Sequence, residues 1–591
     1  MDRRLRAYFD RELTYLRGAA ALFAGESPKI AGRLGIDRFG CSDPYVERLF
    51  QGAAFYSAAS RLEIDGRFAM VLDRAAREGL PAATSSTPSM GVLRFTPDPS
   101  DDALAEGPVV PRGSVCQARV RGGQAIPYRT AHSVRLWPLE VSAAQYDVRN
   151  RDRHGRLPVG RTPAAVARVL LRTGLESIRG LGLDALSIYC GGESLGPGSL
   201  FRALAFGSIG AWAREPGTEA FFPLEVSVSC DQPGRAALPG GSGAGNAIRY
   251  ALEWAACPDR CRFIEVRGFS PAVRACVGQE LELLFALRES DLRLEERLVA
   301  EDLQLFATPA VNLFEDAGLR VRATDASSPI SITDGGAIEP YHIKAVSVLV
   351  PGRSQTRALP AFGTARSANA PSYSVSRAPS SASGPFSGSE WAISVVSPDG
   401  SRVRADNIEL SIHLLASSKK GMLELLDEPS PDIEAPGAAA GATVAFCARP
   451  SPPFADEYEP GSEWAWAGRL SGSVMLFQDT GGEATRELLK PVVARGVKES
   501  SDALASVAGV TSRRAVTRLP GEAGVSRGLE VEVAVGQSAG TADQAATMAP
   551  VLDSLFAGLV SPESYIRLSV VDQAGAVIAA FEPRRGSAMA V

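Results

Sequence analysis

Apolar side chains recur every three or four residues along positions 3–24, and this spacing predicts an amphipathic helix that ends before Gly25 and Pro28. At about 100° per residue the apolar positions cover nearly half of the helix circumference, which is more than one neighbouring surface requires. Glu12 falls inside this arc, so we expect its carboxylate to be bonded to a partner or to lie at the margin. The apolar positions are Leu5, Tyr8, Phe9, Leu13, Tyr15, Leu16, Ala20, Leu22 and Phe23.

A second helix is predicted to begin at Asp43 and Pro44, with Asp43 as the N-cap and Pro44 at the first helical position. Its apolar pattern persists to Gly79, which is long for a globular helix. Either Gly52 or Gly66 therefore breaks it, or it runs through a helical bundle.

Short apolar runs separated by Gly and Pro turns follow from about residue 88 and predict strands with a few helices between them. Residues 351–390 are rich in Ser, Ala, Pro and Gly and are expected to form a flexible excursion. The predicted strands include 90–95, 134–137, 186–189, 391–396, 408–415, 529–535 and 565–571; the predicted helices are 199–212, 247–256 with Asn246 as cap, 485–493 and 549–559.

The pattern as a whole predicts an α+β protein with an N-terminal helical bundle module followed by several mainly-β mixed domains. A chain of 591 residues is too long for a single hydrophobic core. The expected divisions are a helical module at 1–85, an α+β domain at 86–275, a β-rich domain at 276–440 that contains the excursion, and a C-terminal α+β domain at 441–591.

Composition makes several classes of function unexpected for this chain. The 62 basic and 67 acidic residues give a net charge of −5, and no block of Lys or Arg stands out, so nucleic acid is not an expected partner. The start lacks the apolar run of a signal peptide, and no apolar stretch is long enough to insert directly into a membrane. Eight scattered cysteines fit a reducing compartment. We expect a cytoplasmic protein.

The strongest enzymatic candidate is Gly192-Glu193-Ser194-Leu195-Gly196, a G-x-S-x-G match between a predicted strand and a predicted helix. A serine hydrolase using Ser194 would need a base, and the downstream candidates His342 and His413 both lie in strand-like runs. With 58 glycines in the chain, such a match arises readily by chance, and a structural turn is favoured.

Metal and cofactor sites are not predicted. Cys257 and Cys261 have a spacing that zinc could use, but no second ligand pair lies near them, so packed thiols are favoured. His132 and His154 stand alone and are expected to be hydrogen-bonded structural residues. No phosphate-binding glycine motif is present. We expect no enzyme activity and no cofactor.

Several motifs, in order, resemble those of the TssF family, the type VI secretion baseplate subunits also called ImpG or VasA. The resemblance spans nearly the whole chain. It rests on residues 9–16, 28–35 and 43–49, then 87–90, 128–141 and 183–193, then Thr308-Pro309-Ala310-Val311-Asn312-Leu313-Phe314, and finally 449–453, 464–471 and 527–531. The chain departs from the family pattern at the Gly-rich segment 239–245, at Ala307 and at 471–473.

The resemblance implies a structural, phage-baseplate-wedge-like protein. Two TssF copies would pair with one TssG, and the wedge would meet the TssK adaptor, TssE, the sheath proteins TssB and TssC and the spike hub protein VgrG. The baseplate would assemble at the cytoplasmic face of the inner membrane and contact the membrane complex there. A baseplate wedge of a phage tail or of another contractile injection system is the alternative.

The broad apolar face of the N-terminal helices would then be the partner-binding surface, packed in a bundle with a second copy and TssG. The residues expected to contribute are Leu5, Tyr8, Phe9, Leu13, Tyr15, Leu16, Tyr45, Arg48 and Leu49.

Overall fold

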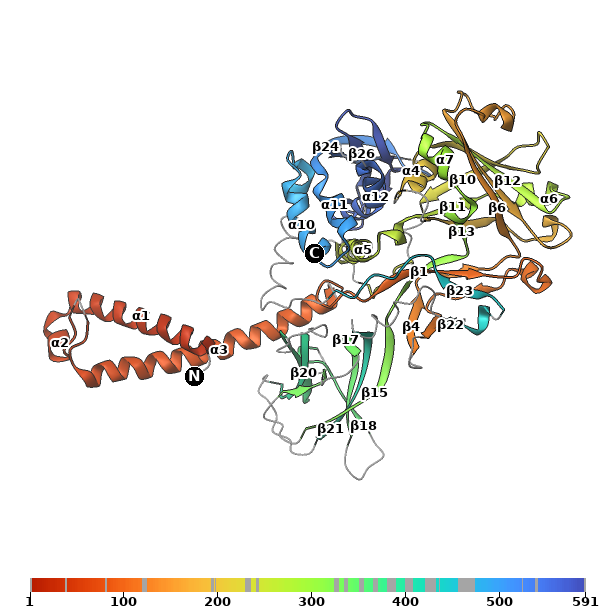
Figure 1. Ribbon diagram of the computed structural model, residues 1–591. Coiled ribbons are helices and arrows are strands. Elements are labelled where there is room, and N and C mark those ends of the chain that lie inside the picture. The colour runs from red at the N-terminus through yellow and green to blue at the C-terminus, as the bar shows by residue number, and fades with distance from the viewer. Residues whose placement is uncertain are drawn as a thin grey trace.

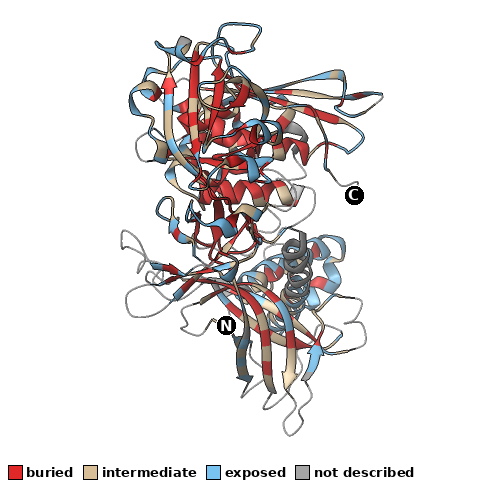
Figure 2. Ribbon diagram, turned by 90° about the vertical axis from the view of Figure 1, so that its right-hand side faces the viewer, coloured by how far each residue is buried: buried red, intermediate tan, exposed pale blue. Residues whose placement is uncertain are grey.

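The computed structural model describes most of the chain. The described residues are 3–37, 40–79, 82–119, 125–192, 196, 198–228, 235–240, 244–323, 329–333, 338–349, 356–364, 370–379, 389–398, 408–419, 432–434, 436–439, 441–454, 473–522, 524–536 and 540–588. A helical arm projects from a body made of several sheets, and the buried residues are concentrated in the middle of that body (Figures 1 and 2).

The arm consists of α1 (Arg3–Glu26), the short α2 (Pro28–Arg33) and α3 (Pro44–Gly79). Both long helices are confirmed. The carboxylate of Asp43 accepts from the backbone N–H of Tyr45 at 2.8 Å, so the predicted cap is present. Neither Gly52 nor Gly66 breaks α3, which runs unbroken from the far end of the arm into the body (Figure 1).

A closed barrel joins segments that are far apart in the sequence. Its strand order is β1-β14-β4-β3-β22-β23. The strands are β1 (Met90–Thr96), β3 (Val115–Arg119), β4 (Ala125–Thr130), β14 (Ala307–Val311), β22 (Asp432–Glu434) and β23 (Thr443–Phe446). The barrel therefore draws strands from three of the four predicted divisions, and the boundaries at 275 and 440 do not separate independent sheets.

An eight-stranded antiparallel sheet lies beside the barrel, in the order β13-β8-β11-β10-β9-β12-β7-β6. It too crosses residue 275. Its strands are β6 (Glu140–Asp147), β7 (Ala165–Arg172), β8 (Ala185–Cys190), β9 (Ser208–Arg214), β10 (Phe222–Val228), β11 (Phe263–Arg267), β12 (Glu280–Leu287) and β13 (Leu303–Leu305). Around it lie α4 (Ser199–Ala205), α6 (Ser270–Ala275), α7 (Leu292–Arg297), and the short pair β2 (Val109–Val110) and β5 (Val134–Arg135).

Two smaller sheets share a core at the lower side of the body (Figure 1). The strands are β15 (Phe314–Ala323), β21 (Ile408–Ser418), β17 (Ile338–Leu349) and β18 (Thr356–Leu359) in one sheet, and β16 (Ile330–Ser331), β20 (Ser389–Val396) and β19 (Ser372–Pro379) in the other. The described parts of the excursion predicted at 351–390 are thus partly strand. Tyr373 and Val375 of β19 pack on this core, although the segment has few large apolar residues.

The C-terminal sheet contains β24 (Val507–Arg518), β25 (Val525–Val535), β26 (Tyr565–Asp572), β27 (Val577–Ala580) and β28 (Arg584–Arg585). The helices α10 (Glu483–Val493), α11 (Lys498–Ala505) and α12 (Thr541–Ala557) pack with α5 (Ala244–Ala256) in its core. Short 3-10 helices cover Asp102–Glu106, Arg151–His154, Ile178–Gly180, Pro258–Cys261, Ala300–Asp302, Gly437–Ala439 and Ser473–Gln478.

Several sequence predictions are wrong in detail. The helix predicted over 549–559 begins at Thr541, and the strand predicted over 134–137 ends at Arg135. The helix predicted over 199–212 ends at Ala205, and β9 begins at Ser208. Asn246 is not a cap, because α5 already begins at Ala244. The α+β class, with an N-terminal helical region followed by mostly β domains, is confirmed.

Candidate partner-binding surface

The arm is an antiparallel hairpin of α1 and α3, and polar contacts fix its register. The Tyr8 hydroxyl bonds the carboxylate of Asp65, and Arg17 pairs with Glu47 nearer the tip. Past the beginning of α1, α3 continues alone toward the body (Figure 1).

Small and apolar side chains form the seam between the two helices. Leu13 and Ala24 of α1 are buried, and Ala54 and Ala58 of α3 are completely buried. Alanines on one helix allow the other to approach closely, so this face of each helix is used within the chain.

Glu12 also lies in the seam and has partners there, as predicted. Its carboxylate accepts from the Ser57 hydroxyl at 2.9 Å and pairs with the Arg61 guanidinium at 3.1 Å. A buried carboxylate bonded in this way costs far less than an unpaired one, so the seam tolerates it.

A stripe of large apolar side chains runs along the outside of α3. Tyr45, Leu49 and Tyr56 are 83%, 71% and 75% exposed. They follow one another at intervals of four and seven residues, which places them on one helix face, away from the seam. We call these three residues the α3 stripe.

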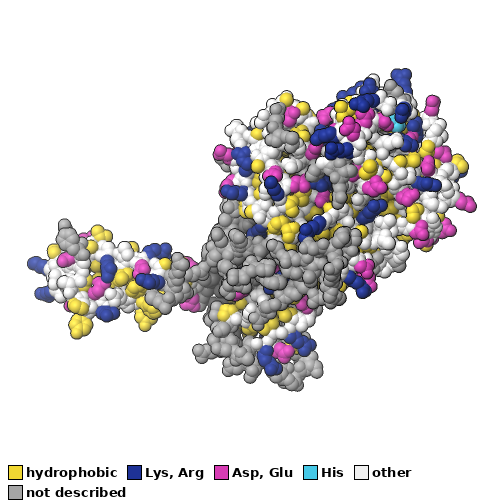
Figure 3. Space-filling view, viewed as in Figure 1, with side chains coloured by type: hydrophobic (Ala, Val, Ile, Leu, Met, Phe, Trp, Pro, Cys, Tyr) yellow, Lys and Arg dark blue, Asp and Glu magenta, His cyan; other side chains and the backbone are white. Residues whose placement is uncertain are grey.

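The outer face of α1 carries a second set. Tyr15 and Leu22 are 70% and 74% exposed and lie seven residues apart, two turns along the same face. We call them the α1 stripe. Hydrophobic side chains project visibly from the arm in Figure 3. Further large apolar side chains exposed on the arm are Phe23, Ile30, Leu34, Phe55 and Ile64.

The nine residues expected at the interface therefore separate into two groups. Leu13 is buried in the seam, and half-buried positions beside it hold Leu5, Tyr8, Phe9 and Leu16. The outward-facing members are Tyr15, Tyr45, Arg48 and Leu49. The apolar pattern in the sequence includes both the residues that pack between α1 and α3 and the residues on the outer face. Periodicity alone does not show which of these residues the second helix of the hairpin covers.

Sequence reasoning missed Leu22 and Tyr56 as interface candidates, although Leu22 is one of the apolar positions of 3–24 and Tyr56 lies within the helix predicted from Asp43. Their heptad spacing from Tyr15 and Leu49 is the signal that could have found them. An exposed apolar surface of this extent on a projecting element is typical of a protein interface.

Comparison with known proteins identifies the family. The family model for "Type VI secretion system, TssF" matches residues 1–588. The type VI secretion system component TssF1 of Pseudomonas aeruginosa PAO1 is 31% identical over 595 residues, which cover 96% of each protein. This chain belongs to the TssF family. The resemblance found in the sequence motifs is thereby confirmed, and the chain is a component of the type VI secretion baseplate.

Two solved structures share the fold of this TssF-family chain. A chain in the cryo-electron microscopy structure of a type VI secretion TssK–TssF–TssG baseplate subcomplex has a TM-score of 0.63 at 18% identity, covering 92% of this chain and 99% of that one. A chain in a type VI secretion baseplate complex has a TM-score of 0.52 at 17% identity, covering 99% and 100%.

The residues considered as catalytic or metal-binding candidates have structural roles where the structure describes them. Ser194 lies outside the described residues. His413 is in β21 and pairs with Glu315 at 3.2 Å, while His342 is in β17. Among the described residues, no three His, Cys, Asp or Glu side chains lie together as metal ligands would.

Buried thiols and histidines are bonded or packed as structural groups. Burial raises the pKa of the Cys257 thiol well above its ordinary value, and Cys261 is also buried. His132 bonds the carbonyl of Arg235 at 3.1 Å, and His154 pairs with Asp147 at 2.7 Å. Both histidines therefore have the hydrogen-bonded role that was expected of them.

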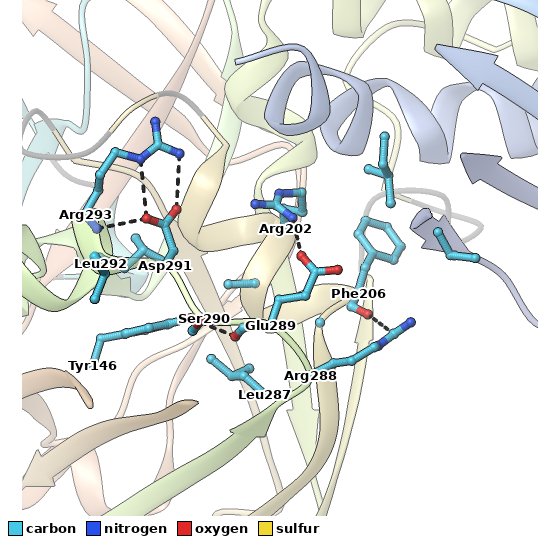
Figure 4. A pocket seen from close by; sticks show the side chains of 15 residues that line it. Tyr146, Arg202, Phe206, Leu287, Arg288, Glu289, Ser290, Asp291, Leu292 and Arg293 are labelled. Carbon is cyan, nitrogen blue, oxygen red and sulfur yellow. Dashed lines mark hydrogen bonds and ion pairs between the residues drawn. The ribbon is translucent and has the colours of Figure 1, made fainter. Parts of the chain in front are cut away.

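A cavity of about 480 Å³ opens between the eight-stranded sheet and the C-terminal domain (Figure 4). Arg202 of α4 bridges Asp543 of α12 at 2.8 Å and Glu289 at 3.0 Å. Asp291 is held by Arg293, whose guanidinium helps to keep the pKa of that carboxyl below its ordinary value even though burial opposes this. Most of the charges that line the cavity are thus paired within the chain, and Arg288 donates to the carbonyl of Phe206 at 2.8 Å. Through Arg202 the cavity is a contact between the eight-stranded sheet and the C-terminal domain.

One basic loop departs from the expectation that no block of Lys or Arg stands out. Between β6 and β7, Arg149, Arg153, Arg156 and Arg161 are all exposed. None of the helices in the described ranges has the length and hydropathy that crossing a bilayer requires.

Proposed function

We propose that this chain is a structural subunit of the baseplate wedge and that its arm is the element that joins it to partner subunits. The observation that supports this most directly is the pair of exposed apolar stripes on a hairpin that projects from the body. Large aromatic and aliphatic side chains of this kind provide most of the binding energy at protein interfaces.

The partners follow from the complexes in which the fold occurs. TssK and TssG accompany TssF in the solved subcomplex of similar fold. We propose that two copies of this chain pair with one TssG and that the wedge meets TssK. We further propose contacts with TssE, the sheath and VgrG, in a cytoplasmic assembly at the inner membrane. Two stripes on different helices fit an arm that lies between two neighbours.

The proposed role is mechanical and not enzymatic. The buried thiols, the bonded histidines and the paired charges of the interdomain cavity support this, because each of these groups is packed or bonded as part of the fold.

Co-expression with TssG tests the proposal. We expect wild type to purify as a complex whose native mass fits two copies with one TssG. The variant Tyr45→Asp/Leu49→Asp/Tyr56→Asp should lose TssG, since each charge would have to be buried against the partner. Because these side chains face solvent in the free chain, its melting temperature should change little.

A matched control carries the same three charges on the body. Val277, Leu292 and Val299 are also exposed apolar residues, so the triple Asp variant at these positions should keep TssG. If the arm variant retains TssG at wild-type mass, or if both variants lose it equally, the arm is not the joining element.

A further inference from the structure

The basic loop joins β6 to β7 and comprises residues 148–164. The two strands are antiparallel neighbours in the eight-stranded sheet, and a turn of about two to five residues is enough to join such neighbours. A connection longer than about 12–15 residues is uncommon and usually has a function of its own. The basic loop is therefore a candidate for a role beyond joining the two strands.

Contacts at its base hold the basic loop against the body. His154 pairs with Asp147 at 2.7 Å, and the buried Arg214 of β9 donates to the carbonyl of His154 at 3.0 Å. Glu295 of α7 accepts from the backbone N–H groups of Val148 and Arg149 at 2.9 and 3.0 Å. These bonds tie the loop to β6, β9 and α7, so its outer residues are presented from a fixed base.

The large apolar side chains of the loop pack toward the body. Leu157 is buried and Val159 is half-buried in a small core that includes Trp212 of β9. Val148 is half-buried against the adjoining core. Among the loop residues whose side chains the structure describes, no Val or Leu is exposed. The loop therefore offers a partner little apolar contact area.

Arginines occupy the outward-facing positions. Arg153, Arg156 and Arg161 are exposed, and within the described part of the chain none of the three has an ion pair or a side-chain hydrogen bond. The Arg149 side chain is 73% exposed and lies 3.9 Å from Glu295, which is too long for a hydrogen bond. The three arginines are thus available to an anionic partner.

The loop has an excess of positive charge. Residues 149–161 contain five arginines and one acidic residue, Asp152. Charges are screened over about 8 Å at physiological salt, so the charge near the loop matters more there than the net charge of −5 of the chain. The loop lies at the top of the body in Figure 1, on the side away from the arm, and Figure 3 shows basic side chains gathered there.

We propose that the basic loop binds the phosphate groups of an anionic lipid surface without inserting into the membrane. This inference rests on the proposed assembly at the inner membrane. Guanidinium groups bind phosphate through paired hydrogen bonds, and clusters of basic residues beside a membrane bind its anionic lipids. Each arginine near such a surface raises the affinity roughly fivefold. One loop therefore binds weakly, and several copies in one baseplate bind firmly together.

A protein partner or a nucleic acid fits the basic loop less well. Protein interfaces bury aromatic and aliphatic side chains at their centres, and the outer surface of the loop is made of arginines instead. Residues 148–164 contain no Phe, Tyr or Trp that could stack on the bases of a single strand. A layer of lipid headgroups presents many phosphates in no fixed register, which suits arginines at irregular intervals.

Flotation of the full-length chain with lipid vesicles tests the proposal. Vesicles of phosphatidylcholine that contain about 30 mol% phosphatidylglycerol would be compared with vesicles of phosphatidylcholine alone. We expect the chain to float with the anionic vesicles and not with the neutral ones, because the loop binds by charge and has little apolar surface to insert. Equal binding to both kinds of vesicle, or binding to neither, would overturn the proposal.

Charge variants of the loop make the test specific. Arg153→Gln/Arg156→Gln/Arg161→Gln should lower the affinity for anionic vesicles at least tenfold. Arg153→Lys/Arg156→Lys/Arg161→Lys should keep most of the affinity, because lysine retains the charge. Wild-type affinity in the Gln variant contradicts the proposal. An equal loss in the Lys variant contradicts it as well, since that result requires a ligand held by the fork of the guanidinium in a fixed geometry.

A matched control removes three exposed arginines elsewhere. Arg320→Gln/Arg514→Gln/Arg527→Gln changes β15, β24 and β25 by the same total charge and should leave vesicle binding unchanged. A loss equal to that of the loop variant would show that only the net charge matters. Polyglutamate and duplex DNA test the other partners: if either binds the wild-type loop more tightly than the anionic vesicles do, the lipid assignment is wrong.

The readouts for the loop and for the arm are separate. The loop variant should still purify with TssG at wild-type mass, and the arm variant at Tyr45, Leu49 and Tyr56 should still float with anionic vesicles. If the arm variant kept TssG, the proposed joining role of the arm would fail while lipid binding stood. If the loop variant floated like wild type, lipid binding would fail while the role of the arm stood.

Discussion

At the scale of single residues, several charged side chains are buried in the body, where ion pairs and hydrogen bonds stabilise them. Glu253 of α5 is fully buried and pairs with the nearly inaccessible Arg260 at 2.8 Å. The same carboxylate accepts from the backbone N–H groups of Ala237 and Leu238. Glu253 therefore holds a loop, a 3-10 helix and α5 together.

Replacing Glu253 by Gln should destabilise the body by about 3 kcal/mol, because it leaves the charge of Arg260 buried without its counter-ion. Urea denaturation of the body measures this. The control is Glu434→Gln, which removes a surface pair with Arg119 and should cost less than about 1 kcal/mol. Similar losses in both variants would mean that Glu253 has no special role in stability.

His132 should make the stability of the body depend on pH. Burial, reinforced by the charges of Arg260 and Arg235, holds the pKa of His132 well below its ordinary value. The unfolded chain therefore binds a proton near pH 6.5 that the folded chain does not yet bind, and stability falls as the pH drops below that value.

We expect His132→Gln to flatten this dependence. One proton difference changes the free energy of unfolding by about 1.4 kcal/mol per pH unit, so the wild-type slope between pH 6.5 and 5 should exceed that of the variant by up to this amount. Urea midpoints at several pH values measure both slopes. Identical slopes would show that His132 does not bind this proton on unfolding.

At the scale of elements, the sequence predicts helices well where local signals agree. The cap at Asp43 and the apolar period predict α3, and no long-range contact is needed to place its start. The sequence predicted a helix where β9 lies, and this error has a physical cause. Ala211 and Ala213 pack on one core and Trp212 on another, so the strand reads as a continuous apolar run that periodicity does not distinguish from a helix.

Replacing glycines of the arm by alanine should have opposite effects on its stability, depending on the backbone conformation at each glycine. Gly18 and Gly52 lie inside helices with open space where a Cβ would point, so each change to Ala should stabilise the arm by up to about 1 kcal/mol. Gly35 has φ +64° and would bring a Cβ to 2.9 Å from the hydroxyl of Ser42, so Gly35→Ala should destabilise it. Hydrogen exchange of α1 and α3 reports both effects, and a common sign for all three changes would contradict this account.

At the scale of the whole molecule, the sequence predicts the strands but not their partners. The motif at 308–314 overlaps β14, which pairs with β1 more than two hundred positions earlier. Strand β23 closes the barrel on the other side of β1. Alternation shows which side chains of a strand are buried, but it carries no information about which distant strand lies beside it. The barrel crosses the predicted boundaries at 275 and 440 for this reason.

The barrel should therefore couple regions that are remote in sequence. Val444 of β23 is buried, and its register partners are Phe95 of β1 and Ile433 of β22. Val444→Asp would bury a charge between these strands at a cost of several kcal/mol, so hydrogen exchange should lose protection in β1 and β3 as well as in β23.

The control places the same change in a different core. Ile393→Asp lies in the core shared by the two smaller sheets, so it should expose β17, β20 and β21 and leave β1 protected. In both variants α12 should keep its protection, because its core contains neither residue. If Val444→Asp exposed only β23, the barrel would be a set of independent pairs; if it exposed α12 equally, the body would unfold as one unit. Selective loss in β1 and β3 instead requires that strands from distant parts of the sequence fold as one cooperative barrel.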